Sequence, residues 1–329
     1  MLLEAHLALG NTLVWLGEFV SAHAHLEQGM ALYIPQHHRS HVLLYGHDPG
    51  VWCQFFAAWA LWHLGYPDQA LTRSHEALTL VQGSSHPLIL ANALGYSAML
   101  HQLRREVQAT HERAEAEMVL AHEHGLGFML AEATFLRGWA LAEQGQGEAG
   151  IAQMRQGLAA WQALGAELFR PYYLALLAEA YGKGGQSEEG MRVVTEALAL
   201  VAQSGEHRGE AELYRLKGTL MLQSKTSHGP VPDPSQTRQD KSEEAGTQHP
   251  APHTQAEVES CFRQALDIAR RQQAKSWELR AAMSLARLWQ RQGKRAEAYQ
   301  LLAEIYDWFT EGFDTADLQE AKALLEELV

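Results

Sequence analysis

Histidine is the residue type of this chain best suited to hold a metal ion, with 18 copies among 329 residues. The densest clusters are HHRSH at 37–41, with His47 nearby, and HEH at 122–124. Zinc needs three or four converging ligands, and the H-E-x-x-H spacing that places two rings on one helical face does not occur. We therefore predict surface or loop histidines, with no metal and no cofactor.

The groupings used in catalysis are also missing from the sequence. Cys53 and Cys261 have no C-x-x-C companion, and Cys53 falls in an apolar segment where a thiolate is disfavoured. Neither a G-x-S-x-G nor a G-x-x-x-x-G-K-[ST] motif is present. The carboxylates of AEAEMVL (114–120) and QSEEG (186–190) occupy positions typical of solvated helix faces and helix starts. We expect a protein that is not an enzyme.

An aromatic stripe is the strongest candidate for a binding site. Trp52, Phe55, Trp59 and Trp62 are spaced by three, four and three residues, so they share one face of a helix. Exposed on a surface, such residues suit recognition of a peptide or helix, because they offer large contact area with little rotamer entropy to lose. Buried against neighbouring helices, the same stripe would be ordinary core. The spacing alone leaves both interpretations open.

The elements that carry this stripe belong to a repeat. Each of a series of six-residue phrases follows one apolar stretch of helical period and precedes another, and glycine at its start can end a helix by adopting positive φ. The phrases are GEFVSA (17–22), GYPDQA (65–70), GQGEAG (145–150), GQSEEG (185–190) and GKRAEA (293–298), with a copy lacking glycine, QLRREV, at 102–107. No alternating strand pattern or Asn-Gly turn occurs. The sequence predicts an all-α solenoid of seven helix-turn-helix repeats with a period near 40.

One segment interrupts the sixth repeat. Residues 224–253 contain five of the ten prolines and, beyond Val231, no large apolar residue, so we expect a disordered polar insertion. Residues 1–223 then hold repeats 1–5 and the first helix of repeat 6. Residues 254–329 hold its second helix, repeat 7 and a capping helix near 315–328. The whole forms one continuous solenoid.

Small residues recur where paired helices would cross. They are Gly10, Ala58, Gly95, Gly138, Ala178, Gly218 and Ala286 in the first helices, and Gly29, Ala77, Ala114, Gly157, Ala197 and Ala265 in the second. This pattern resembles the tetratricopeptide (TPR) repeat. Longer phrases such as RGWALAEQGQGEAGIAQMRQGLAAW (137–161) and YLALLAEAYGKGGQSEEG (173–190) resemble the C-terminal TPR region of bacterial proteins that combine a class III nucleotidyl cyclase with an AAA-type ATPase.

The resemblance implies a concave groove on the face of the aromatic stripe. The groove would be aromatic in its first half and charged in its last, where Arg280, Arg287 and Arg291 could meet an acidic segment or form a solvated helix face. The resemblance assigns these residues to the partner-binding groove: Trp15, Trp52, Phe55, Trp59, Trp62, Asn92, Tyr96, Phe135, Trp139, Tyr172, Arg215, Arg280 and Arg287.

Composition narrows the functional classes. The net charge is −13 and no Lys/Arg block occurs, which excludes nucleic acid as an expected partner. No apolar run approaches the roughly 20 residues of a membrane span, and we predict a cytoplasmic protein. The expected function is a non-catalytic signalling module that binds a protein segment or docks on an ATPase or cyclase domain, in the same chain or another. The alternative is a TPR-like sensor of a small-molecule effector.

Overall fold

The computed structural model describes residues 1–35, 44–81, 86–227 and 253–329, and all regular structure in these ranges is α-helical. Seven helical hairpins and a final helix follow one another, which confirms the predicted all-α solenoid. The hairpins are α1 (Leu2–Leu16) with α2 (Phe19–Ala31), α5 (Pro49–Leu64) with α6 (Pro67–Val81), α7 (Pro87–Leu103) with α8 (Val107–His124), α9 (Gly127–Glu143) with α10 (Gly147–Ala163), α11 (Arg170–Lys183) with α12 (Ser187–Ser204), α13 (Glu210–Ser227) with α14 (Gln255–Arg271), and α15 (Lys275–Arg291) with α16 (Arg295–Tyr306), followed by α17 (Ala316–Leu328).

The turns within the hairpins follow the predicted phrases. Gly17 and Gly65 adopt φ values of 79° and 91°, and the glycines that open the other glycine-containing phrases have positive φ as well. In the phrase without glycine, Arg105 takes this conformation with φ 61°. A left-handed conformation is strained for a residue with a side chain, so another interaction must offset it.

Glycine also lets α9 and α10 approach closely. A Cβ atom on Gly138 would lie 2.7 Å from the backbone nitrogen of Met154, and one on Gly157 would lie 2.7 Å from that of Phe135. Backbone atoms cannot move aside as a flexible side chain can. The recurring small residues therefore set the distance between the paired helices, as the repeat pattern predicted.

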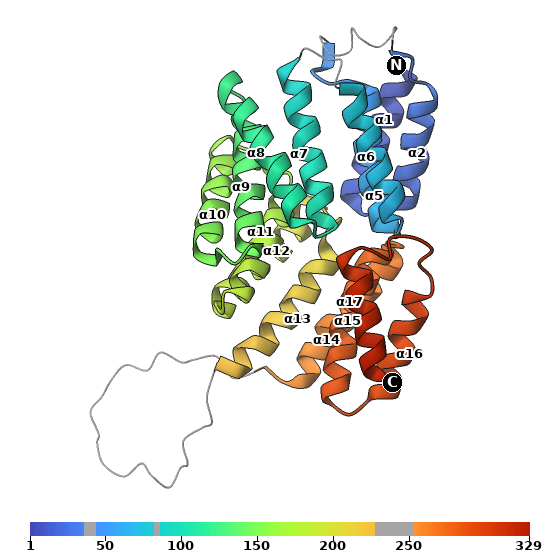
Figure 1. Cartoon of the computed structure of the whole chain (residues 1–329), viewed down its shortest axis with the longest axis vertical. Helices are drawn as coiled ribbons and strands as arrows, with labels where there is room; N and C mark the ends of the chain where they lie inside the picture. The colour runs from blue at the N-terminus through green and yellow to red at the C-terminus, as the bar shows by residue number, and fades with distance from the viewer. Residues whose placement is uncertain (36–43, 82–85, 228–252) are drawn as a thin grey trace, which may run out of the picture.

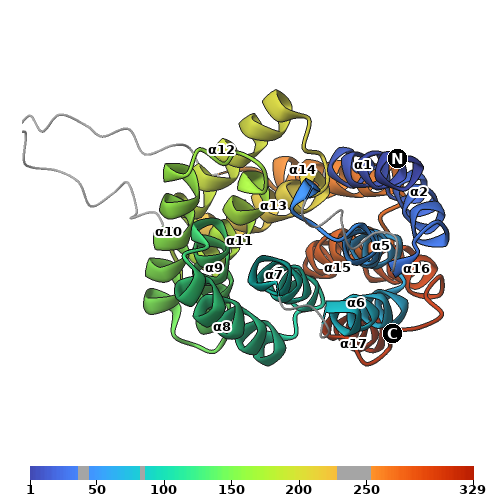
Figure 2. The same cartoon turned by 90° about the horizontal axis from the view of Figure 1, so that it is seen from above.

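The solenoid turns through a full circle, so that its end stacks beneath its beginning. Figure 1 shows α14 to α17, in orange and red, directly below the blue hairpins α1–α2 and α5–α6. Seen from above, α7 and α15 lie near the centre, and α2, α6, α8 and α10 lie toward the outside (Figure 2). The second and last hairpins are therefore in contact, although more than 200 residues separate Trp62 from Ser276 in the sequence.

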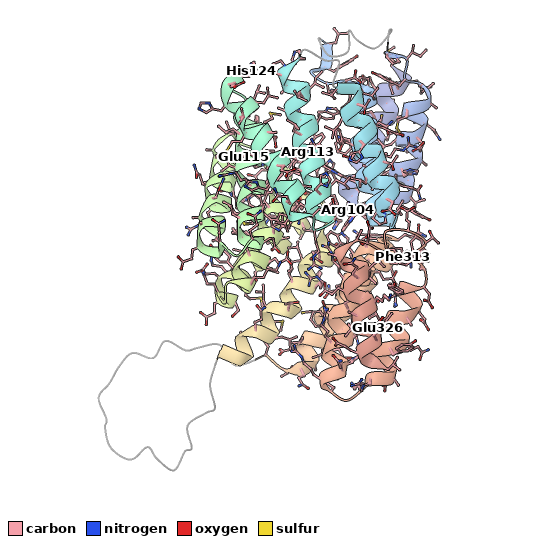
Figure 3. All side chains as sticks on the ribbon, viewed as in Figure 1. Arg104, Arg113, Glu115, His124, Phe313 and Glu326 are labelled. Carbon is pink, nitrogen blue, oxygen red and sulfur yellow. The ribbon has the colours of Figure 1, made fainter. Side chains whose placement is uncertain are left out.

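Polar contacts close this junction. The Glu311 carboxylate accepts hydrogen bonds from the backbone N–H groups of Asp68 and Gln69, at 2.9 and 3.0 Å, and so caps the start of α6. The Ser276 hydroxyl donates to the Trp62 carbonyl oxygen at 2.5 Å. In Figure 3, Arg104 of the upper layer and Phe313 of the lower layer lie at this boundary.

The predicted insertion falls largely outside the described residues. On one side α13 continues to Ser227, and on the other α14 begins after a capping box formed by Thr254 and Glu257. No helix in the described ranges is both long and apolar enough to cross a membrane.

The close approach of α9 and α10 yields a first test. Gly157→Ala should lower the free energy of unfolding by about 1–3 kcal/mol, because its Cβ would overlap backbone atoms of α9. Gly147→Ala is the matched control, since a Cβ there meets nothing within 4 Å. Urea unfolding measures both variants. Equal stabilities would contradict the role given to Gly157.

Candidate functional site

Most of the predicted aromatic groove lies in the packed interior. Trp59 is fully buried and donates its indole N–H to the Tyr96 carbonyl oxygen at 3.3 Å. The buried members of the set are Trp15, Phe55, Trp59, Trp62, Tyr96, Phe135, Trp139 and Tyr172, whereas Trp52 and Asn92 are half-buried. This burial favours the core interpretation of the stripe over an open aromatic groove.

The buried aromatic residues surround the side chain of an arginine, Arg208, from the same chain. The Arg208 side chain, from the loop between α12 and α13, is only 2% exposed. Its guanidinium carbon lies 4.7 Å from the ring centroid of Trp15, 5.1 Å from that of Trp59 and 4.9 Å from that of Tyr172. A cation over aromatic faces is attracted by their quadrupoles, most strongly where water is absent. The aromatic face therefore encloses an internal arginine.

The backbone of the same loop joins three parts of the solenoid. The Arg208 N–H donates to the Trp15 carbonyl oxygen at 3.1 Å, and the Arg208 carbonyl oxygen accepts from the Trp277 indole at 3.2 Å. Both terminal guanidinium nitrogens of Arg208 lack a hydrogen-bond partner among the described residues. Burial in these surroundings lowers the pKa of Arg208.

A cavity lies on the charged side of the concave face, between α11, α13, α15 and α17. Its volume is about 240 Å³, and it is lined by three of the predicted arginines, Arg215, Arg280 and Arg287. A wider hollow of about 540 Å³ follows α14 alone and faces outward. Arg291, the third residue of the predicted arginine row, is exposed and does not line the cavity.

The deep wall of the cavity consists of mutually satisfied ion pairs. Arg215 contacts Glu212 through two nitrogens, at 2.6 and 2.7 Å. Arg280 donates to Asp317 at 2.8 Å and to the Leu103 carbonyl oxygen at 2.6 Å. Two-point contacts of this kind hold the guanidinium groups in fixed orientations.

The lip of the cavity joins the turn of the third hairpin to the C-terminal helix α17. Arg105 donates through Nη1 to Asp317 at 3.0 Å and to Glu320 at 2.7 Å, and Arg287 donates through Nη2 to Glu320 at 2.6 Å. Arg105 belongs to the α7–α8 turn, whereas the two carboxylates belong to α17. These ion pairs offset the left-handed strain at Arg105 and help to close the solenoid.

Sequence reasoning missed Arg105 as a site residue. The only signal was the missing glycine in the phrase at 102–107, where a strained residue in place of glycine is often functional. Lys183 and Glu320 also line the cavity without having been predicted. Their positions depend on how the helices converge, which the spacing of residues along the chain does not reveal.

Glu117 does not lie on the solvated helix face that the sequence predicted for it. The structure buries it completely between α7, α8 and α9, beside the buried Glu132 of α9 and above Gly95. Three of the four carboxyl oxygens have no hydrogen-bond partner among the described residues. Burial raises the pKa of Glu132 to about 8, and burial together with Glu132 raises that of Glu117.

The structure supports no reactive or metal-binding role for the other candidate residues that it describes. Cys53 is buried, and burial raises the pKa of its thiol to about 12, which disfavours the reactive thiolate. The cluster at 37–41 lies outside the described residues. Within the described ranges, no group of three or more His, Cys, Asp or Glu side chains converges in a way that could hold a metal ion.

Comparisons with known proteins agree with this architecture. No family model matches the chain. An uncharacterized protein of Rhizobium meliloti (strain 1021), R02095, is 27% identical over 199 residues, a match that covers 59% of this chain and 19% of that protein. This chain therefore spans about a fifth of the length of that relative.

Among solved structures, a Rap protein complexed with Competence and Sporulation Factor gives a TM-score of 0.59 at 15% identity, covering 99% of this chain and 80% of that one. NprR in complex with its cognate peptide NprX gives 0.56 at 11% identity, covering 99% and 82%. The apo form of RapI gives 0.53 at 10% identity, covering 99% and 100%. At these identities the similarity concerns the fold, and the chain is a TPR-like α-solenoid.

The enclosure of Arg208 by aromatic rings can be tested by two substitutions at that position. Arg208→Ala should lower the free energy of unfolding by about 2–4 kcal/mol, because it leaves a void among the aromatic rings. Arg208→Met fills most of that volume without an unpaired buried charge, so it should stay within about 1.5 kcal/mol of the parent. Denaturant unfolding measures both. An Ala variant as stable as the parent would rule out Arg208 as a central packing element.

The buried carboxyl pair predicts an unusual pH dependence. Since folding raises the pKa of Glu132 from 4.5 to about 8, its neutral form stabilises the protein fully below about pH 4.5, and this stability is lost as the pH rises through about 8. Glu117→Gln removes a second carboxyl group whose pKa burial also raises, so it should reduce the loss of melting temperature between about pH 5 and 9. The exposed Glu115→Gln on the same helix is the control. Parallel pH profiles for all three proteins would contradict this assignment.

Proposed function

We propose that the chain is a regulatory module that binds a segment of a partner protein or peptide at the charged cavity of its concave face. The observation that carries this proposal is the cavity itself. It is the hollow where α11, α13, α15 and α17 converge with the α7–α8 turn. A ligand there would touch the third hairpin and the last part of the array together, so binding could alter how they close on each other.

Two structural neighbours support the choice of ligand class. The Rap protein and NprR, whose folds cover 99% of this chain, were each solved with a bound factor or peptide. Elongated segments suit an array of this kind, because successive helices present side chains along one continuous surface. By analogy, we assign this chain a binding role and no chemistry of its own.

We further propose that the module is the sensory part of a longer signalling protein. The sequence resembles the TPR region of cyclase and ATPase proteins, and the match covers only 19% of the relative's length. In such a protein the solenoid would dock on an ATPase or cyclase domain. A ligand that favours the closed array would then bias the state of that domain.

The alternative, a small-molecule sensor, fits the cavity less well. Small-molecule sites usually enclose about 300–1,000 Å³ with mostly apolar walls. This cavity is smaller, at about 240 Å³, and its walls carry charges of both signs. Trp59 and Trp139, aromatic residues of the predicted groove that could enclose such a ligand, are buried in the core.

A peptide-display selection tests the proposal. A random library is selected on the parent chain and then compared on Ser284→Phe, which fills the cavity from α15. Selected peptides should lose at least about tenfold in affinity on that variant, since they can no longer enter. Thr134→Phe, in a groove of the outer surface, is the control and should bind normally. Failure to enrich any peptide, or equal binding to Ser284→Phe, would refute the proposed site.

A further inference from the structure

We propose that the lip of this cavity recognises the carboxylate of an acidic residue in the partner segment, with Arg105 and Arg287 as the donors. The inference deepens the proposed function and rests on it. It names the chemistry of the ligand, which neither the fold nor the structural neighbours specify.

The two arginines of the lip have hydrogen-bond donors that the described residues do not use. A guanidinium group carries five N–H donors on three nitrogens. Arg105 uses only Nη1 in hydrogen bonds with described residues, and Arg287 uses only Nη2. By contrast, Arg215 and Arg280 each use two nitrogens. The two lip arginines therefore keep unused donors.

The side chains of the two lip arginines are also more accessible to solvent than those of the deep arginines. The side chains of Arg105 and Arg287 are 37% and 38% exposed, whereas those of Arg215 and Arg280 are 14% and 10% exposed. The lip arginines can therefore reach a ligand without breaking the deep ion pairs. Both contact the same Glu320 carboxylate, so the lip already holds one carboxylate between two guanidinium groups and presents the geometry for another.

The charge of the cavity favours an anionic ligand. Its lining carries five cations, Arg105, Lys183, Arg215, Arg280 and Arg287, and three carboxylates, Glu179, Asp317 and Glu320. The lining therefore has a net positive charge, which attracts a negatively charged group. Glu143 also pairs with Lys183, but it does so from outside the cavity lining.

The floor of the cavity adds a second requirement. Leu216, Leu220 and Met283 line it together with the charged groups. An apolar side chain next to the acidic residue could be buried against them, at about 25 cal/mol per Å² of apolar surface removed from water. The preferred segment therefore places a glutamate or aspartate beside a leucine-like residue.

Binding at this lip would also act on closure. Arg105 belongs to the α7–α8 turn and Arg287 to α15, so one carboxylate bridging them adds to the contacts that join the last repeats to the third hairpin. A ligand that interacts better with the closed arrangement shifts the array toward it. Arg105 and Arg287 would then both recognise the acidic residue of the ligand and control the closure of the array.

The test compares two peptide pools that differ at one position, acetyl-Xaa-Leu-Glu-Leu-Xaa-amide and its glutamine twin. The intact chain should prefer the glutamate pool by about tenfold, the effect of one charge-assisted contact. Arg105→Gln with Arg287→Gln should abolish that preference. Arg192→Gln with Arg263→Gln, which removes two exposed, ion-paired arginines elsewhere, should keep it. Circular dichroism establishes that both double variants are folded.

The outcomes separate the inference from the proposed function. Equal binding of both pools by the intact chain would leave peptide binding standing and overturn the carboxylate assignment. A preference that survives in the Arg105, Arg287 variant would overturn the assignment of the donors. No binding of either pool would count against both proposals. Competition by inorganic phosphate that exceeds competition by glutarate at equal concentration would assign the lip to phosphate and overturn the inference.

Discussion

The arrangement of this solenoid depends on the enclosure of Arg208 by aromatic rings. A guanidinium group that loses water must be compensated, and here Trp15, Trp59 and Tyr172 surround it from three directions. Its loop also bonds to α1 through Trp15 and to α15 through Trp277. Because these helices come from the first and last repeats, the single loop determines how tightly the array winds. The closed ring, the buried stripe and the position of the charged cavity all follow from that winding.

Closure of the ring determines which half of the concave face is accessible to a partner. An open array would present its aromatic half, whereas the closed array uses that half internally and leaves the charged half accessible. The lip of the cavity combines an arginine from the α7–α8 turn with carboxylates from α17, so it exists only when the ring is closed. A binding site assembled from distant repeats reports their relative position, which is the property a regulatory module requires.

Individual residues show how far sequence reasoning reached. The helical hairpins, the glycine turns and the small crossing residues followed from local periodicity and from the conformations that glycine permits. Arg280 and Arg287 were predicted to share one helix face because of their spacing, and both line the charged cavity. Glu117 was misplaced, since a carboxylate between helices normally faces water. Only the contact of α8 with α7 and α9 reveals that this one is buried against Glu132.

By itself, the sequence determined the all-α class, the number of hairpins, the positions of their turns and the helix face on which each candidate side chain lies. These properties depend on residues within about one repeat of one another. Tertiary structure alone decided whether that face is open or filled, because small rotations between successive repeats accumulate over the whole array. Glu311 meets Asp68, and Arg105 meets Glu320, only after that accumulation brings the ends together. No local pattern encodes such a sum, and so the site at the junction could be seen only in the folded chain.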